Sequence, residues 1–371
     1  MEVKPIYDLV VVGAGPAGSV TAISAARSGA KVLLLERGKF PRQKVCGEFV
    51  SAEALQLLSG ALSPEHQGLI RDAVRLHRAR LFMDGETIET TVTPPGASIA
   101  RFDLDAALWD SARKWGVEQR ERCVVNSISR PDGGKELFLT HTAEGAIASR
   151  SVVNAAGRWS TLSGRMKPGK EQRWMGIKGH FVEDGPPLST DLYFFDGGYC
   201  GVQPVCMSGS EKVGRVNASA VVKAGGARTL QEVFQCNEAL ADRVKHWQPL
   251  MEELTTFPLI FGLPQPESDG VVRVGDAAAF VDPFVGDGIS LATRSGALAA
   301  ACLAPFFSGE KNLSQATADY RESYRLWLSP IFKSSSQVRR LLRLPRPVRR
   351  PLIFAFQKAP ALTNYFVSAT R

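Results

Sequence analysis

The hydrophobic pattern at the start of the chain predicts a β-α-β unit. Short apolar runs at residues 6–12 and 31–35 are typical of strands buried on both faces, and a helical pattern fills residues 16–28 between them. An apolar stripe with helical spacing covers residues 101–115, and a short buried strand is expected at 151–154. These elements indicate an α/β fold with a parallel sheet.

The pattern changes to that of strands between residues 172 and 263, where glycine and proline interrupt the runs. This arrangement predicts an antiparallel sheet inserted into the parallel one. Its strands are expected at residues 174–181, 190–195, 199–205 and 215–222. The parallel pattern returns at 271–274 and is followed by a helix over 288–303.

The remaining elements are shorter. A helix is expected at residues 52–58, followed by a more polar region up to about residue 100. Two strands are expected at 123–128 and 136–142, and the turn Asp132-Gly133-Gly134 would join them as a hairpin.

Composition and cysteine content favour an ordinary cytoplasmic protein. The longest apolar runs, such as residues 297–307, are shorter than the ~20 residues that a membrane-spanning helix needs. No secretory signal is visible before the first strand. The six cysteines form no C-x-x-C pair and the five histidines do not cluster with them, so we expect neither a metal site nor a disulfide framework.

The net charge of +8 belongs to the end of the chain. From residue 323 onward there are ten Lys or Arg and no Asp or Glu, which leaves 35 basic against 37 acidic residues elsewhere. Apolar residues interleave with the arginines of residues 339–353. We therefore expect either a helical face packed on the body or a peripheral contact with anionic lipid or substrate. No motif indicates nucleic acid binding.

A glycine-rich turn after the first strand introduces the chemistry. The sequence Gly13-Ala14-Gly15-Pro16-Ala17-Gly18 matches G-x-G-x-x-G between a strand and a helix. Gly13 permits the tight turn, Gly15 lets the backbone approach a pyrophosphate, and Gly18 lets helix and strand pack closely. Glu36 ends the next strand, where a carboxylate accepts hydrogen bonds from a ribose diol.

A second glycine-rich segment lies before the helix at 288–303. It consists of Gly275-Asp276 and, further on, Pro283-Phe284-Val285-Gly286-Asp287-Gly288-Ile289. Asp276 at a strand end can accept a hydrogen bond from a flavin ribityl hydroxyl. The amides of Gly288 and Ile289 at a helix start can stabilise negative charge on the flavin. The two glycine-rich segments together predict bound FAD.

These motifs make the chain similar to FAD-dependent oxidoreductases of the para-hydroxybenzoate hydroxylase fold, in the branch of geranylgeranyl reductases and flavin-dependent halogenases. The resemblance spans nearly the whole chain. It rests on the first fingerprint with Glu36-Arg37, the segment Phe40-Pro41-Arg42-Gln43-Lys44-Val45-Cys46-Gly47-Glu48, the helix start Arg101-Phe102-Asp103-Leu104-Asp105, and Gly275-Asp276.

The resemblance implies a Rossmann-type, glutathione-reductase-like FAD-binding domain with a parallel sheet, an inserted antiparallel-sheet substrate domain and a basic helical C-terminal tail. We expect the FAD-binding domain at residues 1–50, 96–165 and 266–330. The substrate domain is expected at 51–95 and 166–265, and the tail at 331–371. Beside the first fingerprint, the implied cofactor-binding residues are Arg37, Lys44, Cys46, Arg101, Gly157, Gly275, Asp276, Pro283, Gly286, Gly288 and Ile289.

The segment that ends at Glu48 is expected to matter most for activity. In geranylgeranyl reductases a similar Cys-Gly pair lies beside the flavin ring, which makes Cys46 and Gly47 candidates for the flavin face. Glu48 is a candidate proton donor, on condition that burial raises the pKa of its carboxyl group. A structural alternative has Cys46 as a small buried hydrophobe and Glu48 paired with Lys44.

The chain departs from the family at two motifs. Many aromatic hydroxylases carry Asp-Gly after the strand that corresponds to residues 151–154, whereas this chain has Ala156-Gly157. The electron donor is therefore either NAD(P)H or a separate flavin reductase. The W-x-W-x-I-P motif of tryptophan-type halogenases is absent from the sequence, which makes halogenation a minor option.

The inserted sheet is expected to form the substrate chamber, with Pro283 and Phe284 closing it from the flavin side. Candidate chamber residues on its strands are Lys178, His180, Phe194, Tyr199 and Gln203. His180 is a candidate general base or a structural histidine. The aromatic residues indicate an apolar or aromatic substrate, although aromatic core residues would give the same pattern.

The sequence thus predicts an FAD-dependent oxidoreductase of specialised or lipid metabolism. The first expectation is a monooxygenase that hydroxylates or epoxidises a lipophilic or aromatic small molecule, such as a polyketide or isoprenoid. The alternative is a reductase that saturates isoprenoid double bonds, motivated by Cys46-Gly47 and by residues 282–289. A halogenase or a flavin-binding protein without turnover is a lesser option. We expect a cytoplasmic location with possible peripheral membrane contact.

Overall fold

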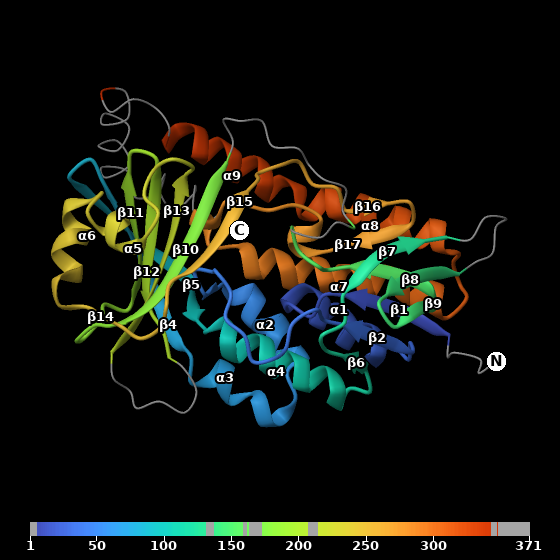
Figure 1. The fold of residues 1–371 in the computed structure, drawn as a ribbon. Coiled ribbons are helices and arrows are strands. Elements are labelled where there is room, and N and C mark those ends of the chain that lie inside the picture. The colour runs from blue at the N-terminus through green and yellow to red at the C-terminus, as the bar shows by residue number, and fades with distance from the viewer. Residues whose placement is uncertain are drawn as a thin grey trace.

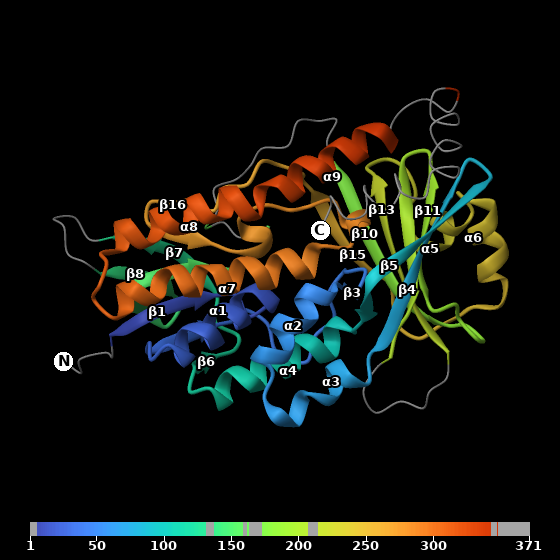
Figure 2. The same cartoon turned by 180° about the vertical axis from the view of Figure 1, so that it is seen from behind.

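The computed structural model describes residues 6–130, 137–158, 162, 173–206, 214–342 and 347. Two sheets organise this part of the chain, one at each end of an elongated molecule (Figures 1 and 2). Helices pack on the first sheet, and two further helices, α8 and α9, run along one side from the first sheet toward the second. The predicted fold is confirmed.

The first sheet is built on parallel strands. Its central strand β1 (Tyr7–Val12) pairs in parallel with β2 (Val32–Leu35) and β9 (Gly145–Asn154). The strand order is β16-β17-β9-β1-β2-β6, with β6 at Glu118–Arg120, β16 at Glu267–Ser268 and β17 at Val271–Arg273. Because β1 and β2 are almost completely buried, their continuous apolar runs were readable in the sequence.

Two helices pack closely against each other beside this sheet. They are α1 (Pro16–Arg27) and α7 (Gly288–Phe307). A Cβ placed on Gly296 of α7 would lie 2.4 Å from the carbonyl oxygen of Ala17 in α1. Glycine is therefore required at this crossing. By length and composition α7 could cross a membrane, but half of its most apolar window is buried against neighbouring elements, as in a core helix.

Other helices surround this pair. Helix α4 spans Arg101–Lys114 and contacts α1, and α8 (Leu313–Trp327) packs on α7. Helix α9 covers Ser329–Leu342, so most of the predicted basic tail lies outside the described residues. The hairpin strands β7 (Val125–Ser129) and β8 (Phe138–Thr142) are present, while the turn Asp132-Gly133-Gly134 also lies outside the described residues.

The second sheet has the strand order β14-β10-β13-β12-β11-β4-β5-β3, with β15 beside β10. The predicted strands are observed as β10 (Trp174–Val182), β11 (Ser189–Phe195), β12 (Gly198–Pro204) and β13 (Arg215–Lys223). Short strands complete it at β3 (Phe49–Val50), β14 (Gln248–Pro249) and β15 (Leu254–Leu259). The sheet is mixed rather than purely antiparallel, because β11 pairs in parallel with β4.

The region expected to be merely polar up to residue 100 contains a long hairpin. It consists of β4 (Val74–Met83) and β5 (Glu86–Ser98), which pair along most of their length. Most of their residues are partly or fully exposed, so the strands lack the apolar runs that marked the others. The sequence pattern therefore missed them.

Helix α2 (Ala52–Ala61) packs against α1, α4 and α7 and also contacts β5, and Leu58 belongs to the core of the first sheet. The domain boundary expected at residue 51 stays a prediction. Short helical turns follow α2 at α3 (Gly68–Arg71) and at the 3-10 segment Pro64–His66. After the short strand β3, the chain thus leaves the second sheet and returns to it at β4.

A separate core lies on the outer face of the second sheet. Helices α5 (Leu230–Phe234) and α6 (Glu238–Arg243), followed by the 3-10 turn Val244–His246, cover this face, as Figure 1 shows at the far end of the molecule. Phe181 of β10 packs its ring against Phe234, at 5.6 Å between centroids. Since helices fill this face, the opposite face of the sheet is the one turned toward the first domain.

Candidate active site

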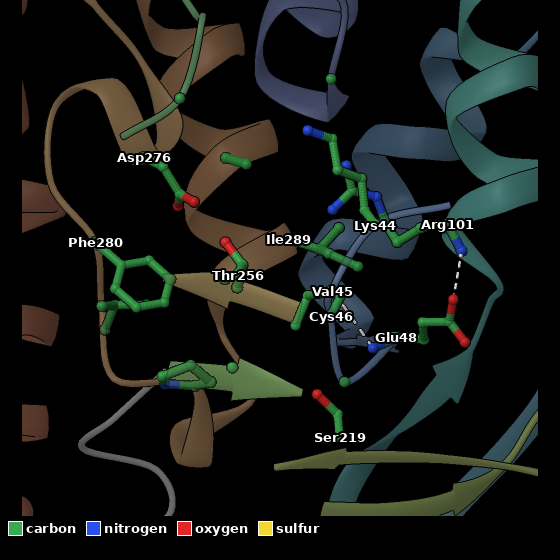
Figure 3. Close-up of a pocket in the computed structure, with 18 of the residues that line it drawn as sticks. Lys44, Val45, Cys46, Glu48, Arg101, Ser219, Thr256, Asp276, Phe280 and Ile289 are labelled. Carbon is green, nitrogen blue, oxygen red and sulfur yellow. Dashed lines mark hydrogen bonds between the residues drawn. The ribbon is translucent and has the colours of Figure 1, made fainter. Parts of the chain in front are cut away.

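A cavity of about 870 Å³ connects the two sheets. Its wall combines the glycine-rich turn after β1, the loop at residues 42–49, the segment around Asp276 and one face of the second sheet. Figure 3 shows this cavity with Lys44 and Arg101 on one side, Asp276 and Phe280 on another, and Ser219 of the second sheet facing Val45 and Cys46. A volume of this size suits a large ligand.

The first fingerprint builds one end of the cavity. Gly13 has φ of +100°, and a Cβ there would lie 2.5 Å from the carbonyl oxygen of Ala155. A Cβ on Gly18 would lie 1.9 Å from the carbonyl oxygen of Gly13, so both positions require glycine. Gly15 faces the cavity together with Pro16 and Ala17. It is also the N-cap of α1, and without a side chain it leaves the first amides of that helix to a ligand.

Glu36 lies at the end of β2 as expected and lines the cavity. Its carboxylate accepts hydrogen bonds from the amides of Ala14 (3.0 Å) and Gly38 (2.9 Å), and Arg42 lies 3.1 Å from it. Burial alone would raise the pKa of Glu36, but Arg42 and the two amides outweigh this effect and lower it. Glu36 is therefore an anion near neutral pH. Ala14 does not line the cavity, and its backbone amide donates a hydrogen bond to Glu36.

Four cations gather beside the fingerprint. Arg37, Arg42, Lys44 and Arg101 all line the cavity. Burial, followed by repulsion from Arg42, Arg101 and Arg37, lowers the pKa of Lys44 to about 8. The site is therefore suited to a bound anion, because an anion would relieve the repulsion between Lys44 and the three arginines.

Arg101 is held in place from its own helix. Its guanidinium group binds Asp105 through two hydrogen bonds of 2.7 and 2.8 Å. Burial acts to lower the pKa of Arg101, but Asp105 outweighs it and raises the pKa above its ordinary value. One terminal nitrogen of Arg101 would lie 3.8 Å from a Cβ on Gly15. The permanent charge therefore stands at the glycine-rich turn, where a pyrophosphate is expected.

The second glycine-rich segment builds the other end of the cavity. Asp276 lies in the 3-10 turn Gly275–Ala277, and its carboxylate is 3.3 Å from Arg158. Gly286 follows the 3-10 turn Pro283–Val285 with φ of +75°, a conformation that favours glycine. Gly275, Gly286, Gly288 and Ile289 line the cavity, as does Gly157. The start of α7 thus points its first amides at the ligand space.

Cys46 and Gly47 lie in the cavity wall between the two domains. The amide of Glu48 donates to the sulfur of Cys46 over 3.3 Å, and the side-chain amide of Asn217 donates to the Cys46 carbonyl over 3.1 Å. Figure 3 shows Cys46 between Ile289 of α7 and Ser219 of β13. The pair thus lies in the cavity wall where the second sheet meets the start of α7, and its place beside a flavin ring stays a prediction.

Glu48 contradicts two expectations. Its carboxylate binds Lys178 and His180 rather than Lys44. Burial alone would raise the pKa of Glu48, but Lys178 and His180 outweigh it and lower the pKa. Glu48 is therefore an anion near neutral pH and does not fit the role of proton donor.

Lys178 and His180 also differ from their expected roles. Both side chains are buried beneath the loop that carries Cys46, and neither is among the described residues that line the cavity. Their strand was predicted correctly, but the partner that covers them, Glu48, lies far away in the sequence. The structure does not support Lys178 as a substrate contact or His180 as a general base.

The chamber expected to receive the substrate is bounded by one face of the second sheet. Alternate residues of β4, β5, β11, β12 and β13 point into the cavity, since successive side chains of a strand face opposite ways. They are Ala79, Leu81 and Met83; Ile88, Thr90 and Val92; Thr190, Leu192 and Phe194; Tyr199, Gly201 and Gln203; and Ser219 and Val221. The predicted residues Phe194, Tyr199 and Gln203 are thus in the chamber. Most of its wall is apolar.

Pro283 and Phe284 lie where the chamber meets the flavin end of the cavity. The ring of Phe284 packs edge-on against Tyr199, with centroids 6.1 Å apart. The Tyr199 hydroxyl donates to Asp282 over 3.3 Å, and burial, reinforced by Asp282, raises the pKa of Tyr199 well above its ordinary value. Tyr199 is therefore a neutral wall residue near pH 7.

Among the cavity residues that the sequence did not predict, three lie together around Asp276. Arg158 binds Asp276, lies 3.3 Å from the hydroxyl of Thr256, and stacks 4.3 Å above the ring of Phe280. Arg158 follows Gly157 directly, so its place in the motif was a signal that could have been used. Thr256 and Phe280 lie in segments without a recognisable motif.

FAD fits this set of residues. The fingerprint, Glu36 and the cations would hold the adenosine and pyrophosphate half. Asp276 and the start of α7 would hold the flavin half, with Cys46 and Gly47 beside the ring. A two-domain protein with a dinucleotide turn, a flavin-sized cavity and an apolar chamber on a second sheet defines the class of flavin-binding oxidoreductases.

The comparison with protein families agrees with this class. A family model described as FAD dependent oxidoreductase matches residues 85–300, and a second model with the same description matches residues 8–97. The chain belongs to the FAD dependent oxidoreductase family, and its cofactor is FAD.

The chain is similar over most of its length to proteins named as reductases. It is 25% identical to a digeranylgeranylglycerophospholipid reductase of Methanopyrus kandleri, over 88% of this chain and 84% of that protein. It is 26% identical to a menaquinone reductase of Mycobacterium tuberculosis, over 99% of this chain and 91% of that protein.

Solved structures share the fold. A flavin-dependent brominase superposes with a TM-score of 0.79 and 20% identity, over 99% of this chain and 93% of that chain. A geranylgeranyl bacteriochlorophyll reductase-like protein from Thermoplasma acidophilum superposes with a TM-score of 0.78 and 20% identity, over 95% of this chain and 91% of that chain. At this level of identity the likeness concerns the fold alone.

Proposed function

We propose that this FAD-dependent oxidoreductase saturates a carbon–carbon double bond in the isoprenoid chain of a lipophilic molecule. The observation that carries the lipophilic substrate class is the apolar face of the second sheet, which continues to Cys46 and Gly47 at the expected flavin end of one cavity. A long apolar chain gains stability from such a wall by leaving water. The names of the reductases reported above support the same reaction class.

Saturation of a double bond requires a hydride equivalent at one carbon and a proton at the other. Reduced FAD supplies the hydride equivalent when bound and is left oxidised. The proton must come from a group in the wall or from water. We assign this role to the Cys46 thiol, because it lies in the wall opposite Ser219 and beside Ile289. Glu48 is not assigned as the donor, because Lys178 and His180 already bind its carboxylate and lower its pKa.

The monooxygenase expected first from the sequence is the alternative. The same apolar chamber would exclude water during oxygen transfer, so its shape supports both reactions. The relatives reported above change the order of preference, because they are named as reductases. For either reaction the electron donor is NAD(P)H or a separate flavin reductase.

Molecular oxygen separates the two reactions. Enzyme that has been reduced with dithionite should saturate a polyprenyl lipid under anaerobic conditions. A product that forms only in air and carries a new oxygen atom would assign the protein to the monooxygenases. A requirement for chloride or bromide would instead assign it to the halogenases.

We also propose a cytoplasmic protein that touches the membrane from which it takes its substrate. Leu326 and Trp327 at the end of α8 are 53% and 68% exposed, next to the basic segment that begins at residue 323. An exposed tryptophan beside cationic residues suits the interface of an anionic bilayer. The neighbouring helix α9 reaches the cavity region, where Arg339 lies 3.5 Å from Asp282.

A further inference from the structure

A buried ionic cluster lies directly beneath the loop that carries Cys46. Glu48 and Lys178 are 0% exposed, and His180 is 1% exposed. One carboxylate oxygen of Glu48 accepts from the Lys178 ammonium group and from the amide of Arg101 (2.9 Å). The other lies 2.9 Å from Nε2 of His180. Charges this deeply buried lower the stability of the fold unless they are paired. A buried ionic cluster at this place therefore points to a role other than stability.

The cluster joins the two domains at the cavity. Lys178 and His180 are two residues apart on β10 and therefore face the same way. In the next strand Lys178 pairs with Ser219, which lines the chamber, and His180 pairs with Asn217, which binds the Cys46 carbonyl. The loop thus covers the β10 end of the sheet face, and the open chamber begins beside it.

The backbone of Glu48 is fixed as tightly as its side chain. Its φ of +63° is uncommon for a residue with a side chain and persists only where the surroundings impose it. Its carbonyl accepts from the amide of Ile99 over 3.0 Å, and its own amide donates to the sulfur of Cys46. Every polar group of Glu48 therefore makes a hydrogen bond, and the bond of its amide is to Cys46, the residue expected at the flavin face.

We propose that Glu48, Lys178 and His180 form a positioning cluster, which fixes the loop of residues 43–48 on the second sheet and thereby places Cys46 and Gly47 against the flavin. Glu48 is thus a positioning residue that acts through Cys46. The inference goes beyond the proposed reaction, because any flavin chemistry at this site would need the same placement.

The charges dictate the choice of variants. Removing Glu48 alone leaves the Lys178 ammonium buried without its partner, so E48Q combines a loss of positioning with a loss of stability. The double variant E48Q/K178M removes both charges and keeps a side chain of similar length at each position. It separates the positioning of the loop from the folding of the protein.

The readout is the reaction of Cys46 with iodoacetamide in the holoenzyme, followed by peptide mass spectrometry, together with the dissociation constant of FAD. In E48Q/K178M we expect Cys46 to react about tenfold faster and FAD to bind about tenfold more weakly, because the loop opens more often. Neither readout measures turnover, so failure of this inference is distinguishable from failure of the proposed reaction.

The control is E183Q. Glu183 directly follows β10 and binds Arg243 through hydrogen bonds of 2.7 and 2.8 Å, on the α6 side of the sheet. Its loss should lower the melting temperature and leave both readouts unchanged. The inference is overturned when E48Q/K178M folds with the Cys46 reactivity and FAD affinity of the original chain, or when E183Q changes them as much.

Discussion

At the scale of single residues, the cavity holds a group of positive charges that the phosphates of the cofactor would balance. Lys44 stands among Arg37, Arg42 and Arg101, and its lowered pKa reflects the positive field of this group. Arg101 is compensated by Asp105, and Arg42 lies beside Glu36, so Lys44 depends most on an anion from outside. The pyrophosphate of FAD, the cofactor of this family, is the anion expected there.

Binding of FAD should therefore weaken as pH rises. The pKa of Lys44 is about 8. At pH values below it Lys44 is charged and attracts the pyrophosphate, whereas at pH values above it the neutral amine does not. We expect the affinity for FAD to fall about tenfold between pH 7 and pH 9, the worth of one charge-assisted hydrogen bond. Fluorescence titration measures it. The K44M variant should bind FAD weakly at both pH values, and an unchanged slope in K44M would contradict the assignment.

Cys46 allows a second test at this scale. If its thiol supplies the proton, C46A should lower the turnover rate by about 100-fold, the usual contribution of a positioned general acid. FAD content should stay at the level of the original chain, since the implied cofactor contacts are spread over many residues. C302A is the matched control, because Cys302 lies on α7 away from the cavity wall. Equal rates in C46A and C302A would remove Cys46 from the mechanism.

At the scale of elements, one face of the second sheet bounds the proposed substrate space. The row formed by Leu192, Gly201 and Ser219 crosses three neighbouring strands and has small side chains at its centre. Helices fill the other face, so only this face is open. The depth of the chamber therefore depends on glycine and serine where neighbouring rows carry Phe194 and Tyr199.

Filling the chamber should block the substrate and spare the cofactor. A Cβ on Gly201 would meet Leu192 at 3.4 Å, an ordinary contact, so a larger side chain there must extend into the cavity. We expect G201L to lose at least about 90% of turnover with a lipid substrate, at unchanged FAD content, because the substrate can no longer fit. Gly60 on α2 has open space around it, so G60L is the control. Full activity of G201L would place the substrate elsewhere.

The sequence predicted some elements much better than others. Buried parallel strands and motif-bearing turns were visible, because continuous apolar runs and glycine-rich sequences are local signals. The hairpin β4–β5 was missed, because its residues face partly toward solvent and partly toward a cavity. The partners of Glu48 were also missed, since an ion pair across more than a hundred residues leaves no local pattern.

At the scale of the whole molecule, α8 and α9 link the first sheet to the second and carry the start of the basic segment (Figure 2). Arg339 of α9 stacks 4.5 Å from the Phe261 ring and approaches Asp282 beside the chamber. A membrane bound along this side would lie close to the substrate space. Under the proposed membrane contact, the exposed residues of α8 would place the substrate space beside the bilayer.

Membrane contact is tested by flotation with vesicles that contain anionic lipid. The double variant L326S/W327S should float less than the original chain, because it loses the apolar part of the contact. Truncation after Ser336 should reduce flotation further, because it removes most of the Lys and Arg residues of the basic segment that begins at residue 323. L188S is the control, since Leu188 is 55% exposed on the other domain. Equal flotation of all four proteins would rule out this surface.

The central claim is that bound FAD reduces a double bond held in the apolar chamber. The most direct measurement mixes anaerobic, dithionite-reduced holoenzyme with a polyprenyl lipid and follows the flavin spectrum and the product mass. The account predicts that the flavin is reoxidised without oxygen while the lipid gains two hydrogen atoms. Reoxidation that occurs only when air is admitted, with the lipid unchanged or oxygenated, would contradict it.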